Sequence, residues 1–452
     1  MNERSGSKVF EAQAQALEKH RDLILETQRF IWAHPETGFR EEVTAPYMED
    51  AFERLGYDLH RAGDIPGFYT VIDTGRPGPE VLVLGELDAL ICAEHPEADP
   101  KTGAVHCCGH SAQCAALVGL AAALREDGIL DGLSGRIRLC AVPAEEMIEL
   151  EYRTALKRSG KIRYLNGKSE FLYRGLFDGV DMALMVHITG GTRLFACKGS
   201  VGCIVKRIIY KGKAAHAGGT PWLGCNALYA ATQGLNAVNA IRETFQESDL
   251  IRCHSIITKG GDAVNVIPET VIIESYVRGS SFKAIAQANR RVNCALCGAA
   301  LSLGANVEIQ DVPGYAPLIN DATLMKVAEE AAQILPSMSF RSVSAVGSAS
   351  TDMGALSCIM PVIHPYIPGA AGMAHSADYR IENPELACLG SGKWLLAMLT
   401  VLLQDGAARA KQIVQDYIPL FSDKNVYFAA VDALADEGDR ICYCEDRAEV
   451  RI

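Results

Sequence analysis

Four short, almost wholly apolar runs recur along this chain of 452 residues, and each ends in residues that are costly to bury. The runs are EVLVLGELDAL at 80–90, GRIRLCAVPAEE at 135–146, VDMALMVHI at 180–188 and MPVIHPYIPG at 360–369. Near-continuous apolar strands are typical of parallel strands covered on both faces. Helical patterns such as SAQCAALVGLAAALRED at 111–127 lie between the runs. This alternation predicts an α/β domain, with a mostly parallel sheet and helices on both of its faces.

The stretch from 197 to 312 has a different pattern, in which strand, helix, two strands, helix and strand follow one another. It predicts a compact α+β unit of the ferredoxin-like kind. We therefore expect residues 1–196 and 313–452 to form one domain that is interrupted by the unit at 197–312. The tail after about residue 405 carries no pattern that assigns its structure.

Composition and charge exclude several classes of protein. The net charge is −12, and no basic stripe with interleaved aromatic residues occurs, so we expect no nucleic-acid partner. The N-terminal residues are polar and charged and no run of 18 apolar residues occurs, so we expect neither a signal peptide nor a membrane span. The 15 cysteines are odd in number and widely spread, which indicates reduced thiols and a cytoplasmic protein.

The motif HCCGH places Cys108 and His110 directly before a predicted helix. In an extended loop, residues two apart point the same way, so both side chains can face one ion. Thiolate and imidazole are good ligands for a borderline divalent metal. A cysteine and a histidine in this position are more often structural, so the motif needs support from other residues.

Glu145 and Glu146 follow the second apolar run, after a proline that stops the strand. Adjacent side chains diverge, so one glutamate can bind a metal while the other exchanges a proton with water. A pair of glutamates is more often a solvated surface feature. Its position at the end of an apolar strand favours the functional interpretation.

Histidines and carboxylates end the remaining runs. His187 ends VDMALMVHI, Glu86 and Asp88 lie in GELDAL, and His375 lies in a loop rich in glycine and alanine after the last run. In open α/β sheets, sites form beyond the carboxyl ends of the strands, so these side chains predict one shared metal centre. Asp88 is either the carboxylate that orients a ligand histidine or an ordinary cap of the strand end.

Seven motifs in this order are similar to those of metallopeptidase family M20-type amidohydrolases, which include aminoacylase, the auxin-conjugate hydrolases and carboxypeptidase G. The motifs are GELDAL, HCCGH, PAEE, MVH, AAHAGGTPWLGCNAL, GGDAVNVIPE and MAHSADY. The residues of the motifs GELDAL, AAHAGG and STDMG most resemble those of the aminobenzoyl-glutamate hydrolase branch.

The resemblance implies which residues form the site. It implies two divalent ions, zinc or manganese in the first place and cobalt or nickel as other suitable ions, and Glu145 as general base and acid. The implied metal ligands are Cys108, His110, Glu146, His187 and His375. It also implies that the insert is a lid that forms a homodimer, in which His216 reaches the partner's active site and stabilises the tetrahedral intermediate. Asn265 and Arg278 are implied to hold the substrate carboxylate.

Several positions depart from the family's usual pattern. Ser111 replaces an aspartate or asparagine, and Gln113 replaces a frequent histidine. Cys107 beside Cys108 leaves two registers, which the CGH match resolves in favour of Cys108. The long basic segment after Glu146 is interpreted as a solvated helix face, and alternatively as a wall that selects an acidic substrate.

The resemblance implies hydrolysis, by metal-activated water, of an amide bond in an N-acyl amino acid, an aminobenzoyl-glutamate-like conjugate or a dipeptide. The expected substrate is a small molecule with a free carboxylate. One alternative is a catalytically altered protein of the same fold that acts as a small-molecule binding or regulatory protein, since fold does not fix function. A second alternative, thiol redox chemistry at Cys294 and Cys297, is disfavoured because this pair falls inside a predicted helix.

Overall fold

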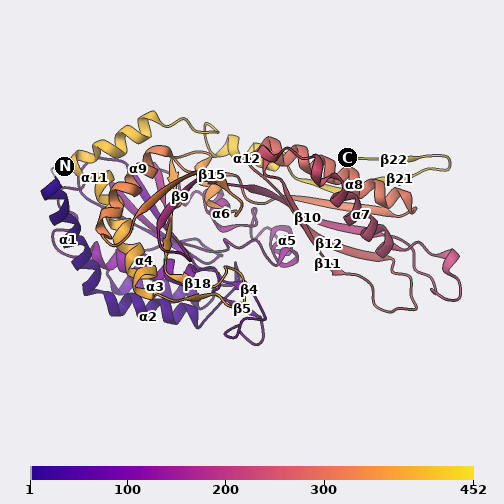
Figure 1. The fold of residues 1–452 in the computed structure, drawn as a ribbon, viewed down its shortest axis with the longest axis horizontal. Helices are drawn as coiled ribbons and strands as arrows, with labels where there is room; N and C mark the ends of the chain where they lie inside the picture. The colour runs from indigo at the N-terminus through magenta and orange to yellow at the C-terminus, as the bar shows by residue number, and fades with distance from the viewer. Residues whose placement is uncertain (1–2) are drawn as a thin grey trace. The chain divides into compact units, whose positions relative to one another are not determined.

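The computed structural model describes residues 3–452, and the chain divides into two compact units (Figure 1). The first unit runs to Gly199 and continues through Ile319–Val346 and Thr351–Lys424. The second unit comprises Ser200–Leu318, Gly347–Ser350 and Asn425–Ile452. The expected division is wrong for the last part of the chain, which was assigned to the first domain. This segment belongs to the second unit, because β20 (Asp436–Asp439) pairs with β13 (Asn306–Pro313).

A six-stranded sheet lies at the centre of the first unit, in the order β1-β2-β6-β3-β7-β16. β6, β3, β7 and β16 are parallel neighbours, whereas β2 and β1 add in antiparallel fashion at one edge. Every residue of β3 is buried, as expected for a strand covered on both faces. The predicted mostly parallel sheet is confirmed. The bounds are β1 His60–Arg61, β2 Phe68–Asp73, β3 Glu80–Glu86, β6 Arg136–Val142, β7 Met182–Leu184 and β16 Val362–Ile363.

Helices cover this sheet, and α4 (His110–Ala123) is buried along its whole length. Its small and aliphatic residues let it contact β3 as well as α2 and α11. The helices α2 and α3 both lie within residues 19–55. The other helix bounds in this unit are α1 Glu3–Lys19, α2 Arg21–Trp32, α3 Thr44–Arg54, α5 Leu150–Arg158, α6 Gly167–Tyr173, α9 Ala322–Ala331, α10 Met353–Ser357 and α11 Ser391–Asp416.

A second sheet of the first unit has the order β14-β9-β17-β8, with β15 paired to β9. β17 pairs in parallel with β8 and in antiparallel fashion with β9. The bounds are β8 His187–Thr189, β9 Leu194–Ser200, β14 Leu318–Ile319, β15 Phe340–Gly347 and β17 Tyr366–Pro368. Small two-stranded pairings add β4 Leu90–Ile91 with β5 Ala104–Val105, and β18 Ala370–Ala371 with β19 Arg380–Ile381.

One helical stretch, Glu385–Asp416, is long and apolar enough by length and composition to cross a membrane. Within its most apolar window, 89% of the residues are buried inside the protein. Such burial is that of a core helix, and Trp394 at 0% exposure packs in the main core of the first unit.

The second unit is built on an antiparallel sheet of five strands in the order β11-β12-β10-β13-β20. The chain order β10-α7-β11-β12-α8-β13 and this strand order make the predicted ferredoxin-like arrangement, extended by β20. Burial alternates along β12, because α7 and α8 pack against one face of the sheet. The bounds are β10 Gly202–Lys211, α7 Ala227–Ile241, β11 Arg252–Lys259, β12 Thr270–Gly279 and α8 Phe282–Ser302, followed after β13 by α12 Lys424–Asp432, β21 Ile441–Tyr443 and β22 Ala448–Val450.

The segment after β6 depends on a close backbone contact. Ala144 adopts a positive φ of 55°, and its carbonyl accepts a hydrogen bond of 3.1 Å from the N–H of Gly167 at the start of α6. A Cβ atom on Gly167 would lie 1.7 Å from the carbonyl oxygen of Pro143. Only glycine therefore lets α6 approach the segment that carries the paired glutamates.

We expect Gly167→Ala to lower the free energy of unfolding by about 2 kcal/mol or more, because the backbone must shift to admit the methyl group. Gly298→Ala is the matched control: this glycine lies exposed inside α8, and no other heavy atom lies within 4 Å of the added Cβ. The control should gain about 0.5–1 kcal/mol. Urea unfolding followed by circular dichroism measures both changes, and equal stability of the two variants would contradict the packing argument.

Candidate functional site

The carboxyl ends of neighbouring parallel strands gather the predicted residues of the first unit. Glu86 ends β3, and Glu145 and Glu146 follow the end of the neighbouring strand β6. His187 was expected at the end of the strand formed by the run at 180–188. That strand, β7, ends at Leu184, and His187 begins the short strand β8. Because adjacent parallel strands end at one edge of a sheet, these distant segments meet there.

The side chains that meet offer donor atoms for metal ions. In the part of the chain from 3 to 452, four groups have one donor atom per residue within 4.8 Å of one another: Cys108, His110 and His187; Cys108, Glu146 and His375; His110, Glu145 and Glu146; and Glu86, Glu145 and Asp352. The first three groups contain only residues that the sequence analysis selected as ligands or as the proton carrier. Cys108 belongs to two of them, so its sulfur lies between two possible ion positions.

The distances around Cys108 support this arrangement. Its Sγ lies 3.5 Å from Nε2 of His187 and 3.4 Å from Nε2 of His375. His375 Nε2 also lies 3.2 Å from Oε1 of Glu146. His375 has a positive φ of 64°, and its N–H donates to the carbonyl oxygen of Cys107 at 2.9 Å. Cys107 thus holds the loop of His375 through its backbone carbonyl oxygen. The sulfur that belongs to the candidate metal-binding groups, which we call the donor groups, is that of Cys108.

Asp88 is completely buried and contacts two of the candidate ligands. One carboxylate oxygen lies 3.3 Å from Nδ1 of His110, and the other accepts the backbone N–H of Glu146 at 2.8 Å. The carbonyl oxygen of Asp88 also lies 2.8 Å from Nδ1 of His110. These contacts leave Nε2 of His110 directed toward the other donor atoms, which is the geometry that orients a metal ligand.

Buried atoms without hydrogen bonds show that the donor set fits divalent ions. Among the described residues, His110 Nε2, Glu146 Oε1 and Glu86 Oε2 are buried and make no hydrogen bond of good geometry, although His110 Nε2 and Glu86 Oε2 lie 3.2 Å apart. Leaving such atoms unsatisfied is costly, and a bound cation would satisfy them. Sulfur, imidazole and carboxylate donors together match the preferences of zinc and related divalent ions.

Burial and nearby negative charge raise the pKa of Glu145 well above its ordinary range. The charges come from Glu86, Glu146 and Asp352. A carboxyl group of this kind holds a proton more readily than an exposed glutamate does. Burial likewise raises the pKa of the Cys108 thiol, so a cation that binds the sulfur must displace a proton.

Lys168 is a residue that the sequence analysis missed. It is fully buried, and its Nζ lies 2.5 Å from carboxylate oxygens of both Glu86 and Asp352. The segment from Arg153 to Arg174 is therefore not simply a solvated helix face, because Arg153 and Lys168 are both at 0% exposure. The polar and charged residues of the segment do not indicate burial, because the partners of Lys168, Glu86 and Asp352, are distant in sequence.

The lysine distinguishes the fourth donor group from the other three. Its ammonium already pairs with Glu86 and Asp352, so these carboxylates hold a cationic side chain in place of a metal ion. Burial raises the pKa of Asp352 to about 6, even though Lys168 acts in the opposite direction. Burial also acts to raise the pKa of Glu86, but Lys168 and His110 hold it below its ordinary value.

His364 is a second residue that the analysis passed over, although it lies in the run MPVIHPYIPG. It is buried, and its ring centroid is 5.7 Å from that of His187. Burial lowers the pKa of His364 to about 3, so its imidazole is neutral and packs beside the donor groups.

Ser111 and Gln113, which depart from the family's usual pattern after CGH, are both buried. Gln113 is buried and accepts the backbone N–H of Glu86 through Oε1 at 3.1 Å. Ser111 is at 0% exposure in the first turn of α4. Gln113 thus holds the end of β3, and neither residue removes a predicted ligand from the donor groups.

The remaining predicted residues belong to the second unit. His216 and Asn265 are neighbours there: His216 forms a β-bridge with Val266, and the N–H of Ala217 donates to the carbonyl oxygen of Asn265 at 2.9 Å. The exposed ring of His216 accepts the backbone N–H of Gly219 at 2.9 Å. Arg278 lies on β12, and its Nη1 donates to Ser350 Oγ at 3.3 Å.

Comparison with known proteins identifies the class. Residues 82–397 match the family model described as peptidase family M20/M25/M40. The human Xaa-Arg dipeptidase is 27% identical over 81% of this chain and 81% of its own length. A p-aminobenzoyl-glutamate hydrolase chain of Escherichia coli is 29% identical over 65% of this chain and 58% of its own length.

A solved structure has the same fold. The YXEP protein of Bacillus subtilis, described as a dinuclear metal-binding peptidase, superposes with a TM-score of 0.63 at 20% identity, over 85% of this chain and 99% of its own. With these relatives and its candidate metal-binding groups, the chain is a metal-dependent hydrolase that acts on amide bonds. It belongs to peptidase family M20/M25/M40.

We expect Lys168→Met to lower the free energy of unfolding by about 3–5 kcal/mol, because it leaves Glu86 and Asp352 buried without their cation. Lys424→Met is the control, since Lys424 pairs with Asp178 at the surface and should change stability by no more than about 1 kcal/mol. Denaturant unfolding compares the two variants. A Lys168→Met protein that unfolds at the midpoint of the parent would show that this buried pairing contributes little.

Proposed function

We propose that the enzyme hydrolyses the amide bond between an acyl or aminoacyl group and an amino acid whose carboxylate is free. Suitable substrates are N-acyl amino acids, aminobenzoyl-glutamate-like conjugates and dipeptides. The observation that carries this proposal is a buried glutamate, Glu145, whose carboxylate lies within 4.8 Å of donor atoms of His110 and Glu146. Relatives named for dipeptides, aminobenzoyl-glutamate and N-acetyl-L-cysteine support the same substrate class.

The metal ligands in this proposal are Cys108, His110, Glu146, His187 and His375. They would hold two divalent ions, and zinc or manganese suits the donors best, with cobalt or nickel as further suitable ions. When bound, such ions act as Lewis acids that polarise a carbonyl group and make water more acidic.

Glu145 carries the proton. It takes a proton from the attacking water as general base, and it gives a proton to the amide nitrogen as that nitrogen leaves. The raised pKa of Glu145 suits this second step, because the carboxyl group keeps its proton until the nitrogen needs it. Asp88 takes no proton in this scheme; it positions His110 and the backbone of Glu146.

The second unit supplies the remaining groups. His216 stabilises the oxyanion of the tetrahedral intermediate from the neighbouring chain of a homodimer. Asn265 and Arg278 hold the substrate carboxylate, for which a planar guanidinium is well suited. We also place the enzyme in the cytoplasm, because 15 free thiols suit a reducing compartment.

Exposed apolar side chains on the second unit support a homodimer. Trp222 is 75% exposed and Val264 is 102% exposed. β11 is an edge strand of its sheet, and Ile256 and Ile257 on it are also exposed. A long exposed edge strand with apolar residues is a ready surface for pairing with another chain.

Glu145→Gln should lower kcat by about 10²–10⁴-fold and leave the metal content unchanged, because glutamine fills the same space but cannot exchange a proton. Glu146→Gln is the matched variant, and it should lose bound metal. Elemental analysis of each purified protein is paired with amine release from a panel of N-acyl amino acids, dipeptides and aminobenzoyl-glutamate. Hydrolysis at the parent rate by a fully metallated Glu145→Gln protein would exclude this role.

Complementation tests the role of His216. His216→Ala and Glu145→Gln proteins should each be nearly inactive, but co-refolded mixtures should regain about a quarter of the parent activity, since mixed dimers contain one intact site. Size-exclusion chromatography with light scattering verifies that dimers form. Absence of regained activity in verified mixed dimers would contradict a histidine contributed by the partner chain.

A further inference from the structure

Three aromatic rings lie in a row across the second sheet of the first unit. His187 on β8 is the register partner of Tyr366 on β17, and Tyr366 is the register partner of Phe195 on β9. Directly paired residues on neighbouring strands project from the same face of a sheet, so all three rings share one face. The ring centroids of His187 and Tyr366 are 5.6 Å apart, and those of Tyr366 and Phe195 are 4.8 Å apart and stacked.

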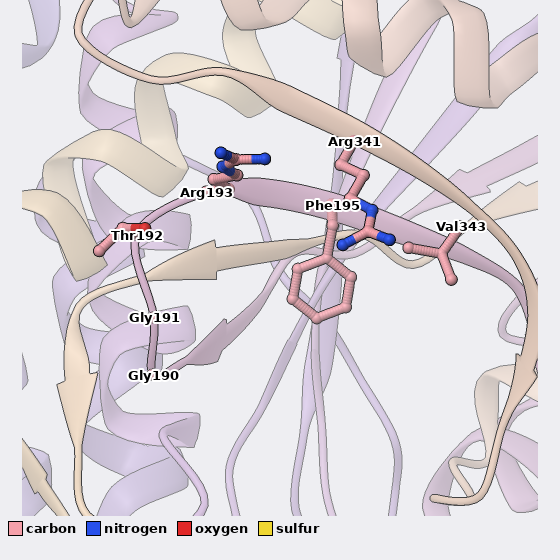
Figure 2. A pocket seen from close by; sticks show the side chains of 7 residues that line it. All are labelled: Gly190, Gly191, Thr192, Arg193, Phe195, Arg341 and Val343. Carbon is pink, nitrogen blue, oxygen red and sulfur yellow. The ribbon is translucent and has the colours of Figure 1, made fainter.

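The row connects the donor groups to a pocket. At one end, Nε2 of His187 lies 3.5 Å from Sγ of Cys108. At the other end, Phe195 lines a cavity of about 320 Å³ together with Arg193, Arg341 and Val343. Figure 2 shows the Phe195 ring below the Arg341 side chain, which comes from β15, and Gly190 and Gly191 also line the pocket.

The pocket carries two positive charges without counterions. Arg193 and Arg341 are exposed, and within residues 3–452 neither guanidinium has a carboxylate oxygen within 4.0 Å. Other arginines of the same unit are paired, as Arg174 is with Asp64 at 2.6 Å. In Figure 2 the Arg341 guanidinium lies near the Phe195 ring, and Arg193 lines the same pocket, so the lining offers an aromatic ring and two cations to a planar, negatively charged ligand.

We propose that this pocket, which we call the acyl pocket, binds the acyl end of the substrate and selects an aromatic acyl group that carries a carboxylate. The inference rests on the proposed amide hydrolysis, in which the scissile carbonyl lies at the donor groups around His187. An acyl group that extends from there along the row meets Tyr366 first, then Phe195, and finally the two arginines. Stacking on the rings favours its aromatic part, and the guanidinium groups bind its carboxylate.

Gly191 lines the pocket in the turn between β8 and β9. Its φ is 94°, a conformation that residues with a Cβ rarely adopt, and no heavy atom lies within 4 Å of an added Cβ. Glycine therefore suits the turn at 190–191, which joins β8 to β9 beside the pocket.

The test uses two substrates with the same amino acid and different acyl groups. One is the N-(4-carboxybenzoyl) amino acid and the other is the uncharged N-benzoyl amino acid. The double variant Arg193→Gln/Arg341→Gln should lower kcat/KM for the carboxybenzoyl substrate by about tenfold or more, mainly through KM, and leave the benzoyl substrate unchanged. The control Arg54→Gln/Arg409→Gln removes two exposed arginines at other ion pairs and should change neither substrate.

The outcomes separate this inference from the proposed function. An unchanged ratio of the two kcat/KM values in the double variant overturns the acyl pocket and leaves amide hydrolysis standing. If the metal-loaded parent hydrolyses neither substrate nor any member of the panel, the proposed function fails. Calorimetric binding of benzene-1,4-dicarboxylate to the metal-loaded protein then decides on the pocket: binding that weakens about tenfold in the double variant and not in the control supports it, and equal binding in all three proteins overturns it.

Discussion

The structure of the first unit depends on the balance of charge at the carboxyl ends of its central strands. Glu86, Glu145 and Glu146 are buried together there, beside the buried thiol of Cys108. Carboxylates removed from water repel one another and lose hydration, so such a cluster needs compensating cations or protons. Lys168 compensates one side of it, through Glu86 and Asp352. The other side has buried atoms without hydrogen bonds, and this is where we propose that divalent ions bind.

The cluster thus has one source of positive charge in the chain itself and, as we propose, a second in bound ions. The ammonium of Lys168 is a fixed part of the fold, and Gly167 beside it allows α6 to approach the segment that carries the glutamates. The side chains of His110, His187 and His375 are the ligands that we propose, and their donor atoms lie close to the cysteine sulfur or to the carboxylates. Glu145 lies between the two regions, so both influence the readiness with which it holds a proton.

Much of this arrangement could be predicted from the sequence, because the end of a parallel strand determines where its last residues lie. Glu145 and Glu146 were predicted in this way, whereas Cys108 and His110 were predicted from their loop before a helix and the insert from its order of strands and helices. Lys168 could not be found, since its burial depends on Glu86 and Asp352, which lie far away in the sequence. The pairing of β20 with β13 is equally non-local, and the short polar strand at 436–439 shows no apolar alternation that would indicate it.

The central claim, that Cys108 lies between two divalent ions, is tested most directly by anomalous X-ray scattering from crystals grown with Mn²⁺ or Zn²⁺. We expect two peaks about 3.5–4 Å apart, one beside His110 and His187 and the other beside Glu146 and His375, with the sulfur of Cys108 near both. No anomalous peak within bonding distance of Cys108 in metal-saturated crystals would contradict it.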